Sequence, residues 1–140
     1  MIVLDTDHLS ELQRRDSTKG KKLLERLQLQ GDSIAMTIVL IDEQLRGSLA
    51  VINESPAGPG QIKPYSRLIE LLEFYSGRTI LPFDQAAAQR FLDLRAAKVR
   101  IGTMDLKIAS IVQARQARLL SANLRDFRQV PGLSVEDWLS

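Results

Sequence analysis

The chain has 140 residues, the size of one domain with a core of its own, and its 44% hydrophobic and 26% charged residues are typical of a globular protein. It contains no cysteine and a single histidine, His8, which excludes disulfides, thiolate catalysis, iron–sulfur clusters, cysteine-bound zinc and multi-histidine metal sites. Nineteen basic against 17 acidic residues leave a net charge of +2, too small to indicate a polyanionic partner by itself, and no apolar run reaches the roughly 20 residues of a membrane span. We therefore expect one cytoplasmic domain over residues 1–140, without membrane contact, whose chemistry rests on carboxylates, amides, hydroxyls and basic groups.

The first part of the chain predicts strands that alternate with helices. Residues 1–4 form a short apolar run that favours a strand buried on both faces, and residues 34–37 predict a second strand. Leucines at helical spacing lie between these two runs, and Asp7 or Ser10 is the expected N-cap. A further helix is indicated by one apolar stripe, made of Ile41, Leu45, Leu49 and Ile52.

The second part of the chain repeats this alternation after a loop rich in Pro and Gly at residues 55–60. In chain order it predicts helical periodicity at 68–75, a strand at 79–83, helices at 84–99 and 104–117, and short strands at 118–121 and 133–135. The alternation predicts an α/β layered fold around a parallel sheet.

Polar side chains follow two of the predicted strands. Asp5 comes directly after the first strand, Asp7 comes two residues later, and Asn123 follows the strand at 118–121. Ligands of parallel sheets bind beyond the carboxyl ends of the strands, and we expect these three side chains to share that edge.

Two further acids lie on predicted helices. Thr103 is the expected N-cap of its helix, which places Asp105 in the first turn, where the helix dipole favours a carboxylate. Glu43 is followed at +4 and +7 by the small residues Gly47 and Ala50. A face of this kind lets another element approach closely, so Glu43 is expected to point into a cleft between layers.

Carboxylates that converge without a basic counterpart need a cation to stay ionised together. Without cysteine or further histidine, the suitable cation is Mg²⁺ or Mn²⁺, which polarises a phosphate and activates water. Local roles remain open for each residue: a turn or cap acid for Asp5, an exposed helix acid for Glu43, a dipole partner for Asp105 and a turn former for Asn123.

Four ordered segments also carry a family pattern. They are residues 2–7 (IVLDTD), 43–47 (EQLRG), 102–109 (GTMDLKIA), and 121–127 (SANLRDF) with VPGL at 130–133 and Asp137-Trp138 behind it. Together they resemble the PIN domain, and within it the VapC-type toxins of bacterial type II toxin–antitoxin pairs.

This resemblance implies a three-layer fold with a central parallel sheet flanked by helices, and a Mg²⁺- or Mn²⁺-dependent endoribonuclease that acts as a toxin. It implies Asp5, Glu43 and Asp105 as the catalytic, metal-binding acids. Asn123 falls where many relatives carry a fourth acid, and Asp126 is the other candidate for that place. The implied partners are an RNA substrate, a cognate antitoxin and a second copy of the chain in a homodimer.

Basic residues are in excess around Asp105, with nine basic and four acidic residues between positions 84 and 128. One interpretation is a solvated helix surface, and the other is a footprint for the phosphate backbone of RNA. The candidates for RNA binding are Arg46, Lys98, Arg100 and Lys107.

Two other functions remain as alternatives. A phosphatase of the haloacid-dehalogenase type would use Asp5 as nucleophile and Asp7 as acid/base, but the late pair of acids that it needs is absent from residues 121–123. A PIN-like binding module with weakened catalysis is the non-enzymatic alternative, and the neutral Asn123 is the feature that favours it.

Overall fold

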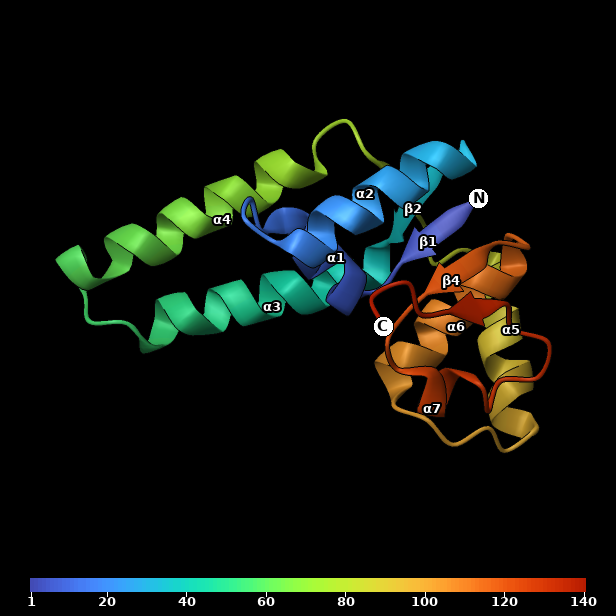
Figure 1. The fold of residues 1–140 in the computed structure, drawn as a ribbon. Coiled ribbons are helices and arrows are strands. Elements are labelled where there is room, and N and C mark those ends of the chain that lie inside the picture. Colours follow the sequence, from blue (N-terminus) through green and yellow to red (C-terminus); the bar gives the residue numbers. More distant parts are fainter.

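Helices cover both sides of a central sheet in the computed structural model, which describes all residues 1–140 (Figure 1). The strands are β1 (Ile2–Leu4), β2 (Ile34–Thr37), β3 (Thr79–Leu81), β4 (Arg118–Leu120) and β5 (Val135–Glu136). The helices are α1 (Thr6–Gln13), α2 (Thr18–Gln30), α3 (Ile38–Glu54), α4 (Ile62–Tyr75), α5 (Gln85–Ala96), α6 (Thr103–Ala114), α7 (Leu124–Phe127) and the 3₁₀ helix η1 (Gly58–Gln61). None of these helices combines the length and the apolar character needed to cross a membrane.

The sheet is parallel throughout, as the sequence predicts, and its strand order is β3-β2-β1-β4-β5. The first strand of the chain therefore lies at its centre. Leu4 is aligned with Leu120 on β4, so the residues that follow these two strands, Asp5 and Ser121, leave the sheet side by side. This register decides which polar groups meet at the carboxyl edge.

Both faces of the sheet are buried, which explains the continuous apolar run at the start of the chain. Val3 lies in a core shared with α5 and α6, whereas Ile2 and Leu4 lie in a second core with α1, α2 and α3. The predicted three-layer arrangement is confirmed.

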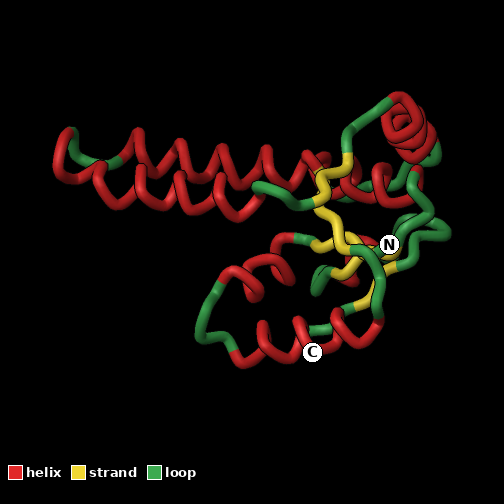
Figure 2. Tube along the Cα trace, turned by 90° about the horizontal axis from the view of Figure 1, so that it is seen from above, coloured by secondary structure: helices red, strands yellow, loops and turns green.

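The helices α3 and α4 form an arm that projects from the body of the molecule (Figures 1 and 2). Thr37 ends β2 and caps α3, because its Oγ1 accepts a hydrogen bond from the backbone N–H of Leu40 at 3.1 Å. Glu43 is therefore in the second turn of α3, near the sheet, while the rest of the helix extends outward.

Two predicted helix caps are wrong. Asp5, rather than Asp7 or Ser10, caps α1, because the chain turns into the helix directly after β1 and Asp5 is the last residue with extended backbone angles. Gly102, rather than Thr103, occupies the N-cap position of α6 and makes no side-chain cap bond. Asp105 still lies in the first turn of α6, as predicted.

Candidate active site

Asp5 is the most buried of the candidate acids, with 7% of its surface exposed. Its Oδ1 accepts a hydrogen bond from the Thr6 backbone N–H at 2.8 Å, and its Oδ2 accepts one from the Ser121 hydroxyl at 2.7 Å. Burial raises the pKa of Asp5 above its ordinary value, and the two hydrogen bonds oppose this only in part. Asp5 is thus held in one orientation at the carboxyl edge of β1.

Asp7 is engaged on both carboxylate oxygens. Its Oδ1 accepts from the backbone N–H of His8 at 2.7 Å and lies 2.6 Å from His8 Nδ1, while its Oδ2 accepts from the Ala122 N–H at 2.9 Å. The Nε2 of the buried His8 accepts from the Trp138 N–H at 3.0 Å, so in the neutral imidazole the proton is assigned to Nδ1, which donates to Asp7. Burial opposes ionisation of Asp7, but the hydrogen bonds to His8 and Ala122 outweigh it and lower its pKa. Asp7 serves here as an anchor for the first helical turn.

Glu43 and Asp105 face Asp5 from two different helices. Burial raises the pKa of Glu43, and the negative charges of Asp105 and Asp5 raise it further. Burial also raises the pKa of Asp105, followed by the charges of Asp5 and Asp126. None of Asp5, Glu43 and Asp105 forms an ion pair with a basic side chain. The three acids, which we call the acid cluster, therefore repel one another without a cation between them.

Asn123 lies beside this cluster as the N-cap of α7. Its Nδ2 donates to Asp126 Oδ2 at 3.1 Å and to Asp105 Oδ2 at 3.4 Å, with the amide orientation assigned from these bonds. The amide of Asn123 thus donates to the carboxylates of both Asp105 and Asp126 and reduces the repulsion between them. A cation bound at this place would reduce the same repulsion. Asn123 and Asp126 are in contact, and both remain candidates for the fourth position of the site.

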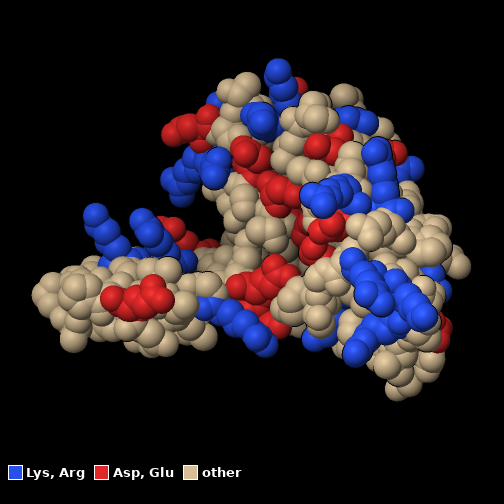
Figure 3. All heavy atoms as spheres, turned by 90° about the horizontal axis from the view of Figure 1, so that it is seen from below, with Lys and Arg blue, Asp and Glu red and all other residues tan.

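The four basic candidates differ in their surroundings. Arg46 is exposed and its Nε already donates to Asp42 at 2.7 Å, a surface pair that a phosphate can replace at little cost. Lys98 and Arg100 are exposed on the connection between α5 and α6, whereas Lys107 is half-buried in α6. On the face drawn in Figure 3, acidic side chains gather in a hollow and basic side chains lie on its rims.

The donor set fits a hard divalent cation in its chemistry, since it consists of mutually repelling carboxylates without a basic neighbour. In the present side-chain positions, no group of three or more acidic or histidine side chains is arranged to hold one ion.

Two residues of the site were not predicted from the sequence, and one predicted feature is misplaced. Ser121 and His8 hold Asp5 and Asp7, and the only sequence signal for Ser121 was its position at the end of a strand next to β1. Gly47 has nothing within 4 Å of the place where a Cβ would lie, so the close approach predicted at this residue is not made, and Gly47 instead lines a groove between α3 and α4.

The comparison with known families and proteins is consistent with this geometry. The model of the PIN domain matches residues 2–133. The "tRNA(fMet)-specific endonuclease VapC" of Salmonella typhimurium is 26% identical over 124 residues, which is 86% of both chains. The Shigella flexneri protein of the same name is 33% identical over 79 residues, which is 54% of this chain and 60% of that protein.

Solved structures share the fold over nearly the whole chain. DNA-bound VapBC from Salmonella typhimurium has a TM-score of 0.74 at 23% identity and covers 98% of this chain and 97% of its own. VapBC2 from Rickettsia felis, bound to a promoter DNA fragment, has a TM-score of 0.73 at 24% identity and covers 99% of both chains. At this identity, the solved structures show that the architecture is shared.

Proposed function

Because the chain belongs to the PIN domain family, we propose that it is a divalent-metal-dependent endoribonuclease and the toxin of a toxin–antitoxin pair. The observation that carries the proposal is the acid cluster: burial raises the pKa of all three carboxyl groups, the charge of Asp5 raises those of Glu43 and Asp105 further, and none of them has a basic partner. We propose Asp5, Glu43 and Asp105 as the ligands of Mg²⁺ or Mn²⁺, with Asn123 or Asp126 completing the site.

The residues around the cluster have distinct parts in this reaction. When bound, the ion would polarise the scissile phosphate and lower the pKa of the attacking water. Ser121 orients Asp5 through its hydrogen bond. The exposed Lys98 and Arg100 precede α6 and would offset the repulsion between the acids and an approaching phosphodiester.

The hydrogen bonds of Asp7 argue against the phosphatase alternative. A phosphatase of that type needs this carboxylate as a proton donor and acceptor, whereas both oxygens of Asp7 already accept hydrogen bonds and its pKa is lowered. The binding-module alternative does not explain why three carboxylates are kept together without a counter-ion.

Protein partners belong to the same proposal. The solved structures named above are complexes of a VapC with its VapB partner, which supports an antitoxin for this chain. The arm exposes large apolar side chains, as expected of a surface that binds an antitoxin or a second copy in a homodimer. These side chains are Leu49, Val51, Ile62, Tyr65, Ile69 and Leu72. We propose that the chain acts in the cytoplasm, where its RNA substrate is found.

A cleavage assay tests the proposed activity, and the names of the two curated relatives make tRNA(fMet) the first substrate to use. Purified chain should cut the RNA internally with Mg²⁺ or Mn²⁺, and excess EDTA or the Asp5→Asn substitution should abolish cleavage. Cleavage that persists in the Asp5→Asn protein would come from a contaminating nuclease or from another site, and would refute the proposal.

A further inference from the structure

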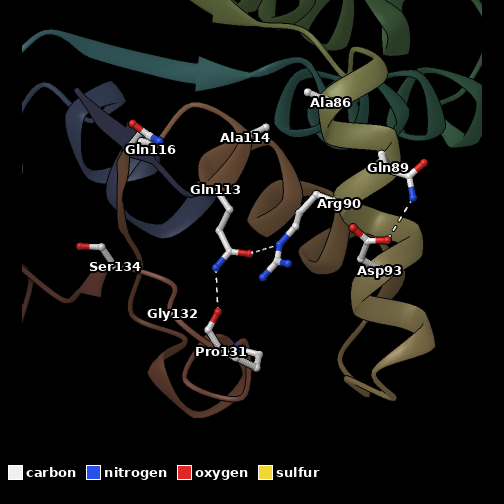
Figure 4. Close-up of a pocket in the computed structure, with 11 residues that line it drawn as sticks. Ala86, Gln89, Arg90, Asp93, Gln113, Ala114, Gln116, Pro131, Gly132 and Ser134 are labelled. Carbon is white, nitrogen blue, oxygen red and sulfur yellow. Dashed lines mark hydrogen bonds between the residues drawn. The ribbon is translucent and has the colours of Figure 1, made fainter.

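A cavity of about 720 Å³ lies away from the acid cluster, between α5, the last turn of α6 and the loop before β5 (Figure 4). Its walls include Arg90 and Asp93 on α5 and Gln113 on α6. Gln113 is eight residues after Asp105, which corresponds to about 12 Å along the helix axis. The helix α6 therefore connects the acid cluster at one end with this cavity at the other.

Arg90 is fixed in the cavity without a charge partner. Its Nε donates to Gln113 Oε1 at 2.7 Å, and Gln113 Nε2 donates to the backbone oxygen of Pro131 at 2.9 Å. Arg90 is half-buried and forms no ion pair. The relay through Gln113 orients the guanidinium and leaves its two terminal nitrogens free to donate.

Asp93 supplies the complementary acceptor. One of its oxygens, Oδ1, accepts from Gln89 Nε2 at 3.0 Å, and the other oxygen has no hydrogen-bond partner. Figure 4 shows the Asp93 carboxylate and the Arg90 guanidinium turned toward the same space. One positive and one negative group make the cavity neutral, which suits a ligand that has both acceptors and donors better than it suits an isolated phosphate.

We propose that this cavity receives one unpaired guanine of the RNA while the scissile phosphate lies at the acid cluster; the proposal rests on the proposed ribonuclease function. Guanine offers two adjacent acceptors, O6 and N7, to the terminal nitrogens of Arg90. Its N1–H and N2–H₂ groups donate, and the free oxygen of Asp93 accepts. Proteins read single-stranded RNA through such edges of splayed bases. At about 3.4 Å per stacked nucleotide, the separation along α6 corresponds to three or four nucleotides.

Mononucleotides test the cavity without relying on cleavage. Guanosine monophosphate, adenosine monophosphate and inorganic phosphate are titrated separately into ¹⁵N-labelled chain, and the side-chain amide of Gln113 is followed by NMR. We expect the guanine nucleotide alone to shift this signal. The Arg90→Lys substitution keeps the positive charge but removes the two terminal guanidinium nitrogens, and Asp93→Asn removes the negative charge of the acceptor. Each substitution should weaken binding of guanosine monophosphate about tenfold. The control is Arg95→Ala, which removes an exposed arginine on the same helix outside the cavity and should leave binding of the guanine nucleotide unchanged.

Equal shifts with all three compounds, shifts with phosphate alone, or unchanged binding in Arg90→Lys would overturn the proposal. Cleavage of a single-stranded RNA with one guanine distinguishes a failure of the guanine site from a failure of the proposed ribonuclease function. In Arg90→Lys, KM for this RNA should rise about tenfold while kcat changes little, and an RNA without guanine should be insensitive to the substitution. If guanine binds but no RNA is cut, the proposed function fails and the cavity remains a guanine site; if RNA is cut equally well by Arg90→Lys, the guanine site fails alone.

Discussion

The carboxylate of Asp105 is less stable as an anion in the folded protein than in the unfolded chain, because burial and the charges of Asp5 and Asp126 raise its pKa above 3.8. Between the ordinary value and the raised one, the folded state binds more protons than the unfolded state. The free energy of unfolding of the metal-free protein therefore loses a contribution as pH rises through that window. A divalent ion bound at neutral pH would reverse this penalty.

Asp105→Asn should make the metal-free protein more stable and the loaded enzyme inactive. The gain in Tm over the original chain, measured by thermal unfolding in EDTA, should be near zero well below the ordinary pKa of 3.8 and should grow as pH rises above that value. RNA cleavage should fall at least about 100-fold, since loss of a ligand costs more than loss of an outer partner. Glu54→Gln, which neutralises an exposed acid at the end of α3, is the matched control. A variant that is less stable than the original at pH 7 would contradict the repulsion argument.

Ser121→Ala should impair the site without removing any acid. The buried hydroxyl donates to Asp5 and accepts from the Asn123 N–H at 3.0 Å, so its loss should cost about 1–3 kcal/mol of unfolding free energy. The pKa of Asp5 should rise further without this bond, which moves the rising limb of the pH–activity profile to higher pH. Ser121→Thr keeps the hydroxyl and should restore the profile. An unchanged profile in the alanine variant would mean that the hydrogen bond to Asp5 is only structural.

At the scale of elements, the pair α1 and α2 depends on one close backbone approach. A Cβ on Gly20 would lie 2.2 Å from the Glu11 carbonyl oxygen, and backbone cannot move aside as a side-chain tip can. Gly47 in α3 has the opposite environment, because a Cβ there meets nothing within 4 Å. A side chain is therefore excluded at Gly20 and has room at Gly47.

Substitution of each glycine by alanine should change stability in opposite directions. Gly20→Ala should destabilise by about 1–3 kcal/mol because α1 and α2 must separate. Gly47→Ala should stabilise by about 0.5–1 kcal/mol because alanine loses less backbone entropy in a helix. Chemical denaturation of both variants measures the difference. A stabilised Gly20→Ala protein would show that α1 and α2 can separate at no cost.

The sequence predicts those elements whose signals are local. The apolar run at residues 1–4 and the helical position of Asp105 need only the neighbouring residues to be recognised. The N-cap at Asp5 depends on where β1 stops, and the bond between Asp5 and Ser121 joins residues 116 positions apart, so neither follows from local spacing. The cavity beside Arg90 likewise depends on how α5 packs against α6, which the helical periodicity of each segment does not define.

At the scale of the whole molecule, charge is distributed to admit a polyanion to an acidic site. Acidic side chains gather in the hollow seen in Figure 3, and basic side chains lie at its rims. In such an arrangement the basic side chains at the rims attract the phosphates of an RNA strand, while the acidic side chains remain available to bind a divalent ion. Binding of RNA should therefore depend on salt.

The double variant Lys98→Ala, Arg100→Ala should lower the steepness of that salt dependence. For single-stranded RNA, the slope of log affinity against log salt should fall by roughly 0.7 for each phosphate that the variant no longer neutralises. The affinity is measured by fluorescence anisotropy across a salt series in an Asp5→Asn background, which prevents cleavage. Arg14→Ala, which removes an exposed arginine after α1, is the control. If the slope stays the same, the two basic residues only solvate the α5–α6 connection.

The position of β1 at the centre of the sheet sets an order of events during synthesis. Asp5 is made 116 positions before Ser121, which holds it, and β4, which flanks β1, is made just before Ser121. At about 5–20 residues per second, the ribosome needs roughly 6–23 s to make that stretch. During this interval the nascent chain contains its first acids but lacks the strand that completes their setting. A chain that has not yet made β4 therefore cannot hold Asp5 in its folded orientation, and we expect it to gain nuclease activity only after this strand is complete.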